Sequence, residues 1–134
     1  MQDVTAAVII QNEKVLITRR AAGEKHAGWW EFPGGKIEVG ETPEVCLRRE
    51  LMEELGVDAL IGNLLAESIF RYETGAIRLL AYRAEIITGE IRLSVHDECQ
   101  WVSASDLSQC KLLPADRPIA EQLAKIPIQT EGAV

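Results

Sequence analysis

Residues 35–57 read GKIEVGETPEVCLRRELMEELGV, and this stretch contains both the start signal and the end signal of one helix. Thr42 supplies a hydroxyl group that can cap a helix N-terminus, and Pro43 follows at the first helical position, where no N–H is needed. Gly56 is the residue type that most readily takes the left-handed conformation after a helix. The stretch therefore predicts a helix that begins after Thr42 and runs to Leu55.

Two stripes of side chains run along this predicted helix. At about 100° per residue, three glutamates fall on one stripe roughly 100° wide. These glutamates are Glu50, Glu53 and Glu54. The adjoining stripe consists of Leu47, Leu51 and Leu55. The leucine stripe predicts the face that packs against the protein core.

The glutamate stripe has two interpretations. An ordinary acidic surface is the usual explanation for charge on a helix. However, only Glu53 has a basic partner at helical spacing, namely Arg49 four residues earlier, and unpaired like charges cost roughly a few tenths of a kcal/mol each. A divalent ion would turn the clustered carboxylates into ligands. The physics of the helix alone leaves both interpretations open.

Predicted strands and further helices surround this helix. Val4–Ile10 and Val15–Thr18 are β-branched and apolar, and they predict a hairpin with a turn at residues 11–14. Further strands are predicted at Leu64–Tyr72, Ile77–Ile87 and Glu90–Val95, and helices at residues 103–107 and 115–125. This order predicts a mixed α/β (α+β) sandwich. We expect one domain over residues 1–128 and a flexible tail at residues 129–134.

The composition limits the class of protein. The chain has 134 residues, 21 acidic against 14 basic residues, a formal net charge of -7 and a pI near 4.9. This balance disfavours nucleic-acid polymers as partners, because such partners require basic surface. No apolar run reaches the ~18–20 residues of a membrane span, and the N-terminus lacks the basic region of a secretory signal. We expect a cytoplasmic protein that binds no membrane and is a monomer or a homodimer.

The few cysteines and histidines argue against a zinc site. The three cysteines, Cys46, Cys99 and Cys110, have no CxxC spacing, and the chain has only two histidines. A divalent cation would therefore be held mainly by carboxylates, which favours Mg²⁺ or Mn²⁺. We interpret the cysteines as thiols of a reducing compartment and His96 as a polar loop residue.

Residues 35–57 resemble the Nudix box, which consists of a glycine, five residues, a glutamate, seven residues and then Arg-Glu-aliphatic-x-Glu-Glu-x-Gly-aliphatic. All nine defined positions are filled, by Gly35, Glu41, Arg49, Glu50, Leu51, Glu53, Glu54, Gly56 and Val57. The resemblance is to the MutT-like branch of nucleoside triphosphate pyrophosphohydrolases and includes residues 17–22, 30–38 and 113–118. It implies the Nudix fold, with a mixed β-sheet sandwiched between helices in an αβα arrangement.

The resemblance also implies roles for the residues of the box. The implied metal ligands are Glu50, Glu53, Glu54 and the backbone carbonyl of Gly35. Mg²⁺ is the implied ion, with Mn²⁺ as a substitute. Either Glu53 or Glu54 would orient or deprotonate the attacking water. Arg49 and Glu41 would form an ion pair that aims the carboxylates.

Some members of the family carry a further catalytic acid before a late tryptophan. In this chain the residue directly before Trp101 is Gln100, which cannot act as a base. Glu98 is therefore the candidate for this acid, with Asp97 as the alternative.

Four residues are candidates for substrate binding: Arg20, Phe32, Lys36 and Asp116. The resemblance implies that Arg20, Phe32 and Asp116 surround the nucleobase, and the basic residues Arg20 and Lys36 suit phosphate. An ionised Asp116 only accepts hydrogen bonds, which suits the amino group of cytosine or a guanine-type edge. Two alternatives stay open, namely that Asp116 caps the last helix and that Phe32 is a core residue.

These observations predict a Mg²⁺-dependent enzyme that cleaves a nucleoside triphosphate to the monophosphate and pyrophosphate. We expect a modified or non-standard substrate, similar to 8-oxo-dGTP or to CTP, and a role in nucleotide-pool sanitation. One alternative is hydrolysis of a nucleotide sugar or another nucleoside diphosphate derivative. A catalytically silent nucleotide-binding module is the other, and the complete set of box glutamates argues against it.

Overall fold

The computed structural model describes residues 1–127, which form one six-stranded sheet with helices on both of its faces. The strands are β1 (Gln2–Gln11), β2 (Lys14–Arg20), β3 (Trp30–Glu31), β4 (Asp58–Tyr72), β5 (Gly75–Thr88) and β6 (His96–Val102). The helices are α1 (Pro43–Leu55), the 3₁₀ helix η1 (Ala104–Gln109) and α2 (Arg117–Leu123). The tail predicted at residues 129–134 lies outside the described residues.

The sheet is mixed, with strand order β3-β2-β1-β5-β4, and β6 also pairs with β2. Strands β1 and β5 run parallel, whereas the pairs β1–β2, β2–β3, β2–β6 and β4–β5 are antiparallel. The turn between β1 and β2 contains Asn12 and Glu13, both with positive φ (50° and 64°), which suits a tight hairpin. The hairpin and the mixed fold class predicted from the sequence are confirmed.

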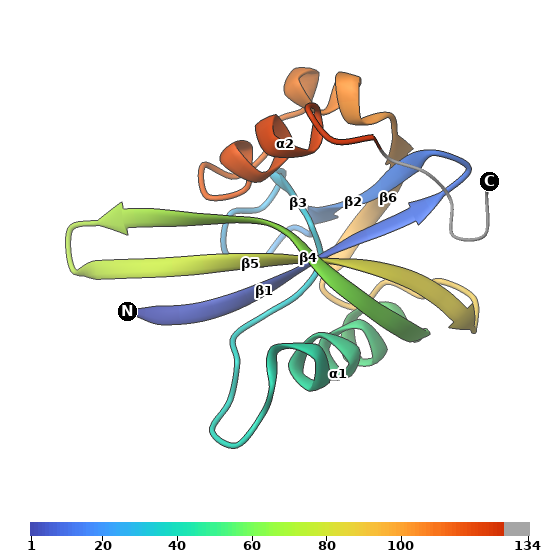
Figure 1. Cartoon of the computed structure of the whole chain (residues 1–134), viewed down its shortest axis with the longest axis horizontal. Coiled ribbons are helices and arrows are strands. Elements are labelled where there is room, and N and C mark those ends of the chain that lie inside the picture. The colour runs from blue at the N-terminus through green and yellow to red at the C-terminus, as the bar shows by residue number, and fades with distance from the viewer. Residues whose placement is uncertain (128–134) are drawn as a thin grey trace.

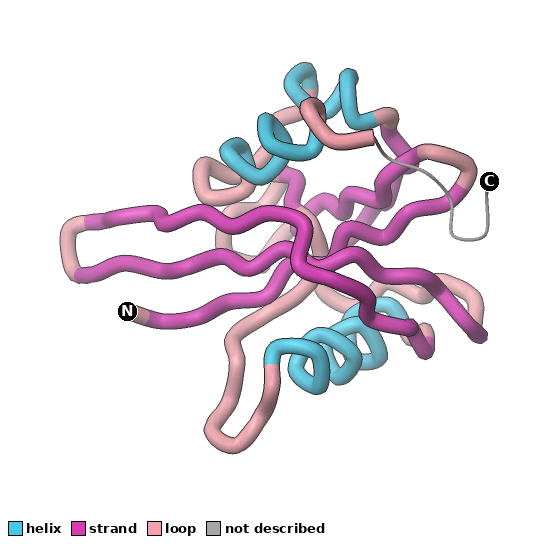
Figure 2. Tube along the Cα trace, viewed as in Figure 1, coloured by secondary structure: helices cyan, strands magenta, loops and turns pink. Residues whose placement is uncertain are grey.

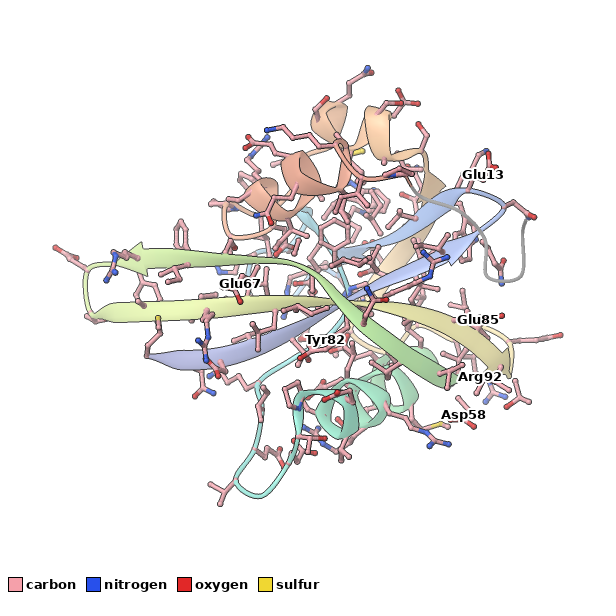
Figure 3. All side chains as sticks on the ribbon, viewed as in Figure 1. Glu13, Asp58, Glu67, Tyr82, Glu85 and Arg92 are labelled. Atoms are coloured by element: carbon pink, nitrogen blue, oxygen red, sulfur yellow. The ribbon has the colours of Figure 1, made fainter. Side chains whose placement is uncertain are left out.

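The helices lie on opposite sides of the sheet, α1 on one side and η1 with α2 on the other (Figure 1; the trace in Figure 2 shows the same layers). One core cluster contains the three leucines of the predicted apolar stripe of α1, and Tyr82 of β5 packs against it (Figure 3). The other cluster contains Leu107 of η1 and Ile119 and Leu123 of α2. This αβα arrangement confirms the expected architecture.

Helix α1 begins and ends where the sequence predicts. The hydroxyl of Thr42 accepts the N–H of Val45 at 3.2 Å, and Gly56 takes a left-handed conformation (φ 68°) with its N–H bonded to the carbonyl of Met52. With 13 residues, α1 is the longest helix that the structure describes. None of the helices within residues 1–127 is long and apolar enough to span a bilayer.

The strand predicted at Glu90–Val95 is wrong, because this segment is a loop that closes the end of α1. The N–H of Arg92 donates to the carbonyl of Leu55 at 2.8 Å. The hydroxyl of Ser94 donates to the carbonyls of residues 53 and 54, at 3.1 and 3.3 Å. These carbonyls have no partner inside the helix, so the loop supplies the hydrogen-bond donors that they need.

Two further boundaries differ from the prediction. A strand, β6, begins at His96, in a segment that the sequence analysis treated as a loop. Helix α2 covers only Arg117–Leu123, because residues 114–116 form a turn and residues 124–125 follow the helix as a further turn. The backbone partners of β6 lie on β2, far away in the sequence, whereas the turns at both ends of α2 are closed by local backbone bonds.

Candidate active site

The acidic stripe of α1 lies against the two glycines that open the box. A Cβ atom on Gly35 would stand 2.5 and 2.7 Å from the two carboxylate oxygens of Glu50, so a side chain at this position would push that carboxylate aside. The backbone of Gly34 donates a hydrogen bond to Glu54. The exposed fraction of the side chain is 15% for Glu50 and 58% for Glu53. The loop and the helix therefore form one acidic site with an exposed side.

Arg49 connects the acids of this site. Its Nε and Nη2 atoms donate to the two carboxylate oxygens of Glu41, at 2.7 and 2.9 Å, so the ion pair expected between these residues is present. Nη1 donates to Glu50 at 2.9 Å and to Glu53 at 3.3 Å. Hydrogen bonds from Arg49 lower the pKa of Glu41 to about 2. Arg49 thus fixes the loop that carries Glu41 to the acidic face of α1.

Glu54 stands in a different environment from the other two acids. Burial, the charge of Glu31 and the charge of Glu50 together raise the pKa of Glu54 to about 9. Its Oε1 atom is buried and has no hydrogen-bond partner in the described part of the chain. A divalent cation would supply both the missing partner and the opposite charge, and carboxylate oxygens are the donors that Mg²⁺ prefers. The residues present therefore fit such an ion.

The carbonyl of Gly35 points away from these acids. It accepts the N–H of Thr5 at 2.8 Å and the hydroxyl of Thr5 at 3.0 Å, and the carbonyl of Pro33 also accepts a bond from β1. Carbonyl directions alternate along extended backbone, so the carbonyl between them, that of Gly34, points to the side where the N–H of Gly34 meets Glu54. The ligand role expected for the Gly35 carbonyl is at odds with its hydrogen bonds.

A second charged group lies on β2, β3 and β6 and centres on Glu31, which the sequence analysis did not single out. Nη1 of Arg20 and Nε2 of His96 both contact Oε2 of Glu31, at 2.9 and 2.8 Å. The side chain of His96 is fully buried, so its interpretation as a polar loop residue is wrong. The sequence signal for Glu31 was its place in the segment at residues 30–38 that resembles the family.

A β-bulge determines which way the acids of β6 face. Arg19 and Arg20 are neighbours on β2, but their partners on β6, Glu98 and His96, are two residues apart. The extra residue, Asp97, reverses the alternation of side chains. Glu98 and Asp97 pair with Arg19, at 3.3 and 2.7 Å. The structure thus places both candidates for the further acid with Arg19, on the opposite face of β2 from Arg20.

Asp116 is a buried acid beside β3. Its Oδ2 atom accepts the N–H of Phe32 at 3.0 Å, and burial together with the charge of Glu31 raises its pKa to about 8. Asp116 occupies the N-cap position of α2, as the alternative interpretation expected, but its side chain makes no capping bond to the helix. Phe32 is 3% exposed and belongs to the core cluster under α2. Lys36 is exposed, beside the acidic site.

The two charged groups are electrostatically connected through Glu31. Its charge raises the pKa of Glu54 on one side and of Asp116 on the other. Glu31 is therefore coupled both to the acids of α1 and to Asp116. Such a site suits a molecule with phosphates at one end, where a cation is needed, and a polar ring at the other.

Comparison with known proteins agrees with this geometry. The family model described as NUDIX domain matches residues 1–124. The CTP pyrophosphohydrolase of Escherichia coli strain K12 is 36% identical over 121 residues, which cover 90% of this chain and 90% of that protein. The 8-oxo-dGTP diphosphatase of Haemophilus influenzae is 38% identical over 120 residues, 88% of each chain. The solution structure of the E. coli ORF135 protein has a TM-score of 0.84 at 32% identity and covers 99% of this chain and 95% of its own.

Proposed function

This chain belongs to the Nudix hydrolase family, and from that premise we propose that it hydrolyses a nucleoside triphosphate to the nucleoside monophosphate and pyrophosphate, with Mg²⁺ as its metal ion. The names of two relatives, at 36% and 38% identity, support this class of substrate. The observation that carries the proposal is the state of Glu54, whose buried Oε1 atom lacks a partner next to the charges of Glu50 and Glu31.

Glu50, Glu53 and Glu54 would hold the metal ion, together with the carbonyl of Gly34, which faces the same side as Glu54. No three His, Cys, Asp or Glu side chains within residues 1–127 are already arranged to hold an ion. The exposed Glu53 would therefore turn away from Arg49 when the ion binds. When bound, the ion neutralises phosphate oxygens and lowers the pKa of a water.

The chain's own residues would then position the reaction. Arg49 holds Glu50 through a 2.9 Å bond and takes its own orientation from Glu41. The proton of the attacking water would pass to the exposed Glu53 or to the buried Glu54. Lys36, exposed at the start of the box, is available to the phosphate chain.

We propose that Asp116 reads the nucleobase. With a pKa near 8, its carboxyl group is mainly neutral at pH 7, and a neutral carboxyl group donates one hydrogen bond and accepts others. It can therefore meet a ring carbonyl as well as an amino group. This supports guanine-type and cytosine-type nucleotides, including oxidised ones, as substrates.

The experiment is a pyrophosphate-release assay with Mg²⁺ on 8-oxo-dGTP, dGTP, CTP, dCTP and ADP-ribose. The wild type is expected to release pyrophosphate from at least one triphosphate. Glu54→Gln should lose at least about a hundredfold in kcat. Glu44→Gln, which changes an exposed glutamate of the same helix outside the stripe, should behave like the wild type. Release of orthophosphate instead of pyrophosphate, or turnover of ADP-ribose alone, would contradict the proposal.

A further inference from the structure

His96 is an unusual residue to bury in this fold. Its side chain is fully buried, Nε2 lies 2.8 Å from Oε2 of Glu31, and Nδ1 has no hydrogen-bond partner among the described residues. An ionised carboxylate only accepts hydrogen bonds, so Nε2 carries the proton of this bond. Leaving a buried polar atom unpaired is unfavourable. An apolar residue would avoid this cost, so the ring is better explained by its bond to Glu31.

The backbone of β6 determines the direction of the His96 side chain. In a regular strand the side chains at positions 96 and 98 would face the same side, away from Glu31. The bulge at Asp97 places them on opposite sides. The residue before His96 is also held in place, because the carbonyl of Val95 accepts the N–H of Ala21 at 3.1 Å. His96 therefore has a fixed direction.

Arg20 supplies a second donor to the same oxygen of Glu31. Its Nη1 atom lies 2.9 Å from Oε2, and its Nε atom donates to the carbonyl of Lys25 at 2.6 Å, which limits the rotation of the guanidinium group. Glu31 is thus held from two strands, β2 and β6. Its charge acts on both Glu54 and Asp116, and the N–H of the next residue, Phe32, is bonded to Asp116 at 3.0 Å.

We propose that His96 is a positioning residue for nucleotide selection: together with Arg20 it fixes the carboxylate of Glu31, the residue before Phe32, whose N–H is bonded to Asp116. This inference rests on the proposed function. The bond between His96 and Glu31 shares no hydrogen-bonded atom with the acids of α1 within residues 1–127, and a change at His96 leaves the charge of Glu31, which acts on Glu54, in place. Loss of the bond should therefore change which nucleotide is preferred more than it changes the maximal rate.

The experiment compares His96→Phe, His96→Gln, Glu31→Gln and the double variant His96→Phe/Glu31→Gln, with kcat and KM measured for CTP, dGTP and 8-oxo-dGTP. His96→Phe keeps an aromatic ring and removes the donor. It should raise KM for the preferred nucleotide about tenfold and flatten the preference, with kcat within about threefold of the wild type. His96→Gln, which retains an N–H donor, should restore most of the preference. The double variant should be no worse than Glu31→Gln alone.

Asp58→Asn is the matched control, because it removes the paired carboxylate of another ion pair, to Arg48, at the far end of α1 (Figure 3). It should leave KM and the nucleotide preference unchanged. A His96→Phe protein with a lower Tm but an unchanged nucleotide preference would overturn the inference. Additive effects of His96→Phe and Glu31→Gln on the preference in the double variant would also overturn it.

Two further outcomes are distinguishable. Should His96→Phe fail to fold, a flat preference in Glu31→Gln together with a largely retained preference in His96→Gln would support the inference. A wild-type preference in Glu31→Gln would overturn it. A wild type that hydrolyses no nucleoside triphosphate would instead remove the proposed function itself.

Discussion

Asp116 and Phe32 are joined by a 3.0 Å hydrogen bond from the backbone N–H of Phe32 to the carboxyl group of Asp116. This bond connects the turn before α2 to the residue that follows β3. The acid that makes it is only 6% exposed. The bond thus holds a titratable group at one end of the proposed site, and the burial of that group, which raises its pKa, gives stability a dependence on pH.

Asp116→Asn should flatten the dependence of Tm on pH. The carboxyl group loses its proton near pH 3.8 in the unfolded chain and near pH 8 in the folded protein, so the folded state holds the extra proton between these values. The free energy of unfolding therefore falls as pH rises from 4 to 8, with a slope from this group on the order of 1 kcal/mol per pH unit. Asparagine can still accept the N–H of Phe32 but does not titrate. Thermal unfolding at pH 5, 6.5 and 8 with a chelator measures this, and parallel curves for both proteins would refute it.

Glu54→Gln should stabilise the metal-free protein at pH 8 while it destroys activity. Glu54 resists ionisation because it is buried near Glu31 and Glu50, so at pH 8 the folded protein must keep a proton on Glu54 that the unfolded chain releases. Glutamine is neutral in both states and removes this cost. In the wild type, Mg²⁺ should raise Tm because it binds the folded state, and in Glu54→Gln this increase should largely vanish. Calorimetry with EDTA and then with Mg²⁺ provides both readings. An equal increase in the two proteins would show that Glu54 is not a ligand.

Arg49→Lys should lower kcat by about ten- to a hundredfold and leave the fold intact. Lysine keeps the charge but cannot make the two parallel bonds to Glu41 and at the same time contact Glu50. Arg48→Lys is the control, since Arg48 pairs with Asp58 away from the acids. Steady-state kinetics compares the two variants, and equal activity in them would contradict a positioning role for Arg49.

Gly35→Ala should displace the carboxylate of Glu50 and reduce activity by at least about tenfold. The new Cβ would stand within 2.7 Å of both Glu50 oxygens, closer than atoms in contact can be. Gly62→Ala is a suitable comparison, because its Cβ would meet Arg83 at an ordinary 3.5 Å. Pyrophosphate release and Tm should both stay near wild type in Gly62→Ala. A fully active Gly35→Ala would mean that Glu50 can move without loss.

Local signals made part of this molecule predictable. The cap at Thr42, the stop at Gly56 and the leucine stripe each depend on neighbours within one helix, and all three are confirmed. The ion pair between Arg49 and Glu41 was expected from the resemblance to the family, and it is present.

Tertiary partners decided what the sequence did not predict. The segment Glu90–Val95 has the residues of a strand, but its donors bond to the end of α1 instead. The bulge at Asp97 depends on the register between β2 and β6, and so the direction of His96 could not be read from alternation. The partner of Asp116 lies 84 residues earlier in the chain. No local pattern signals such a bond.

The loop at residues 90–95, which bonds to the end of α1, affects the local unfolding of the protein. Isolated helix ends fray, and amides there exchange with solvent quickly. The last turn of α1 bonds to Arg92 and Ser94, and β6 begins two residues beyond Ser94. Opening of that turn should therefore be coupled to separation of β6 from β2. In hydrogen–deuterium exchange, the amides of residues 52–55 should exchange at the slow rate of those in β6, so that the acids lie in one of the last regions to open.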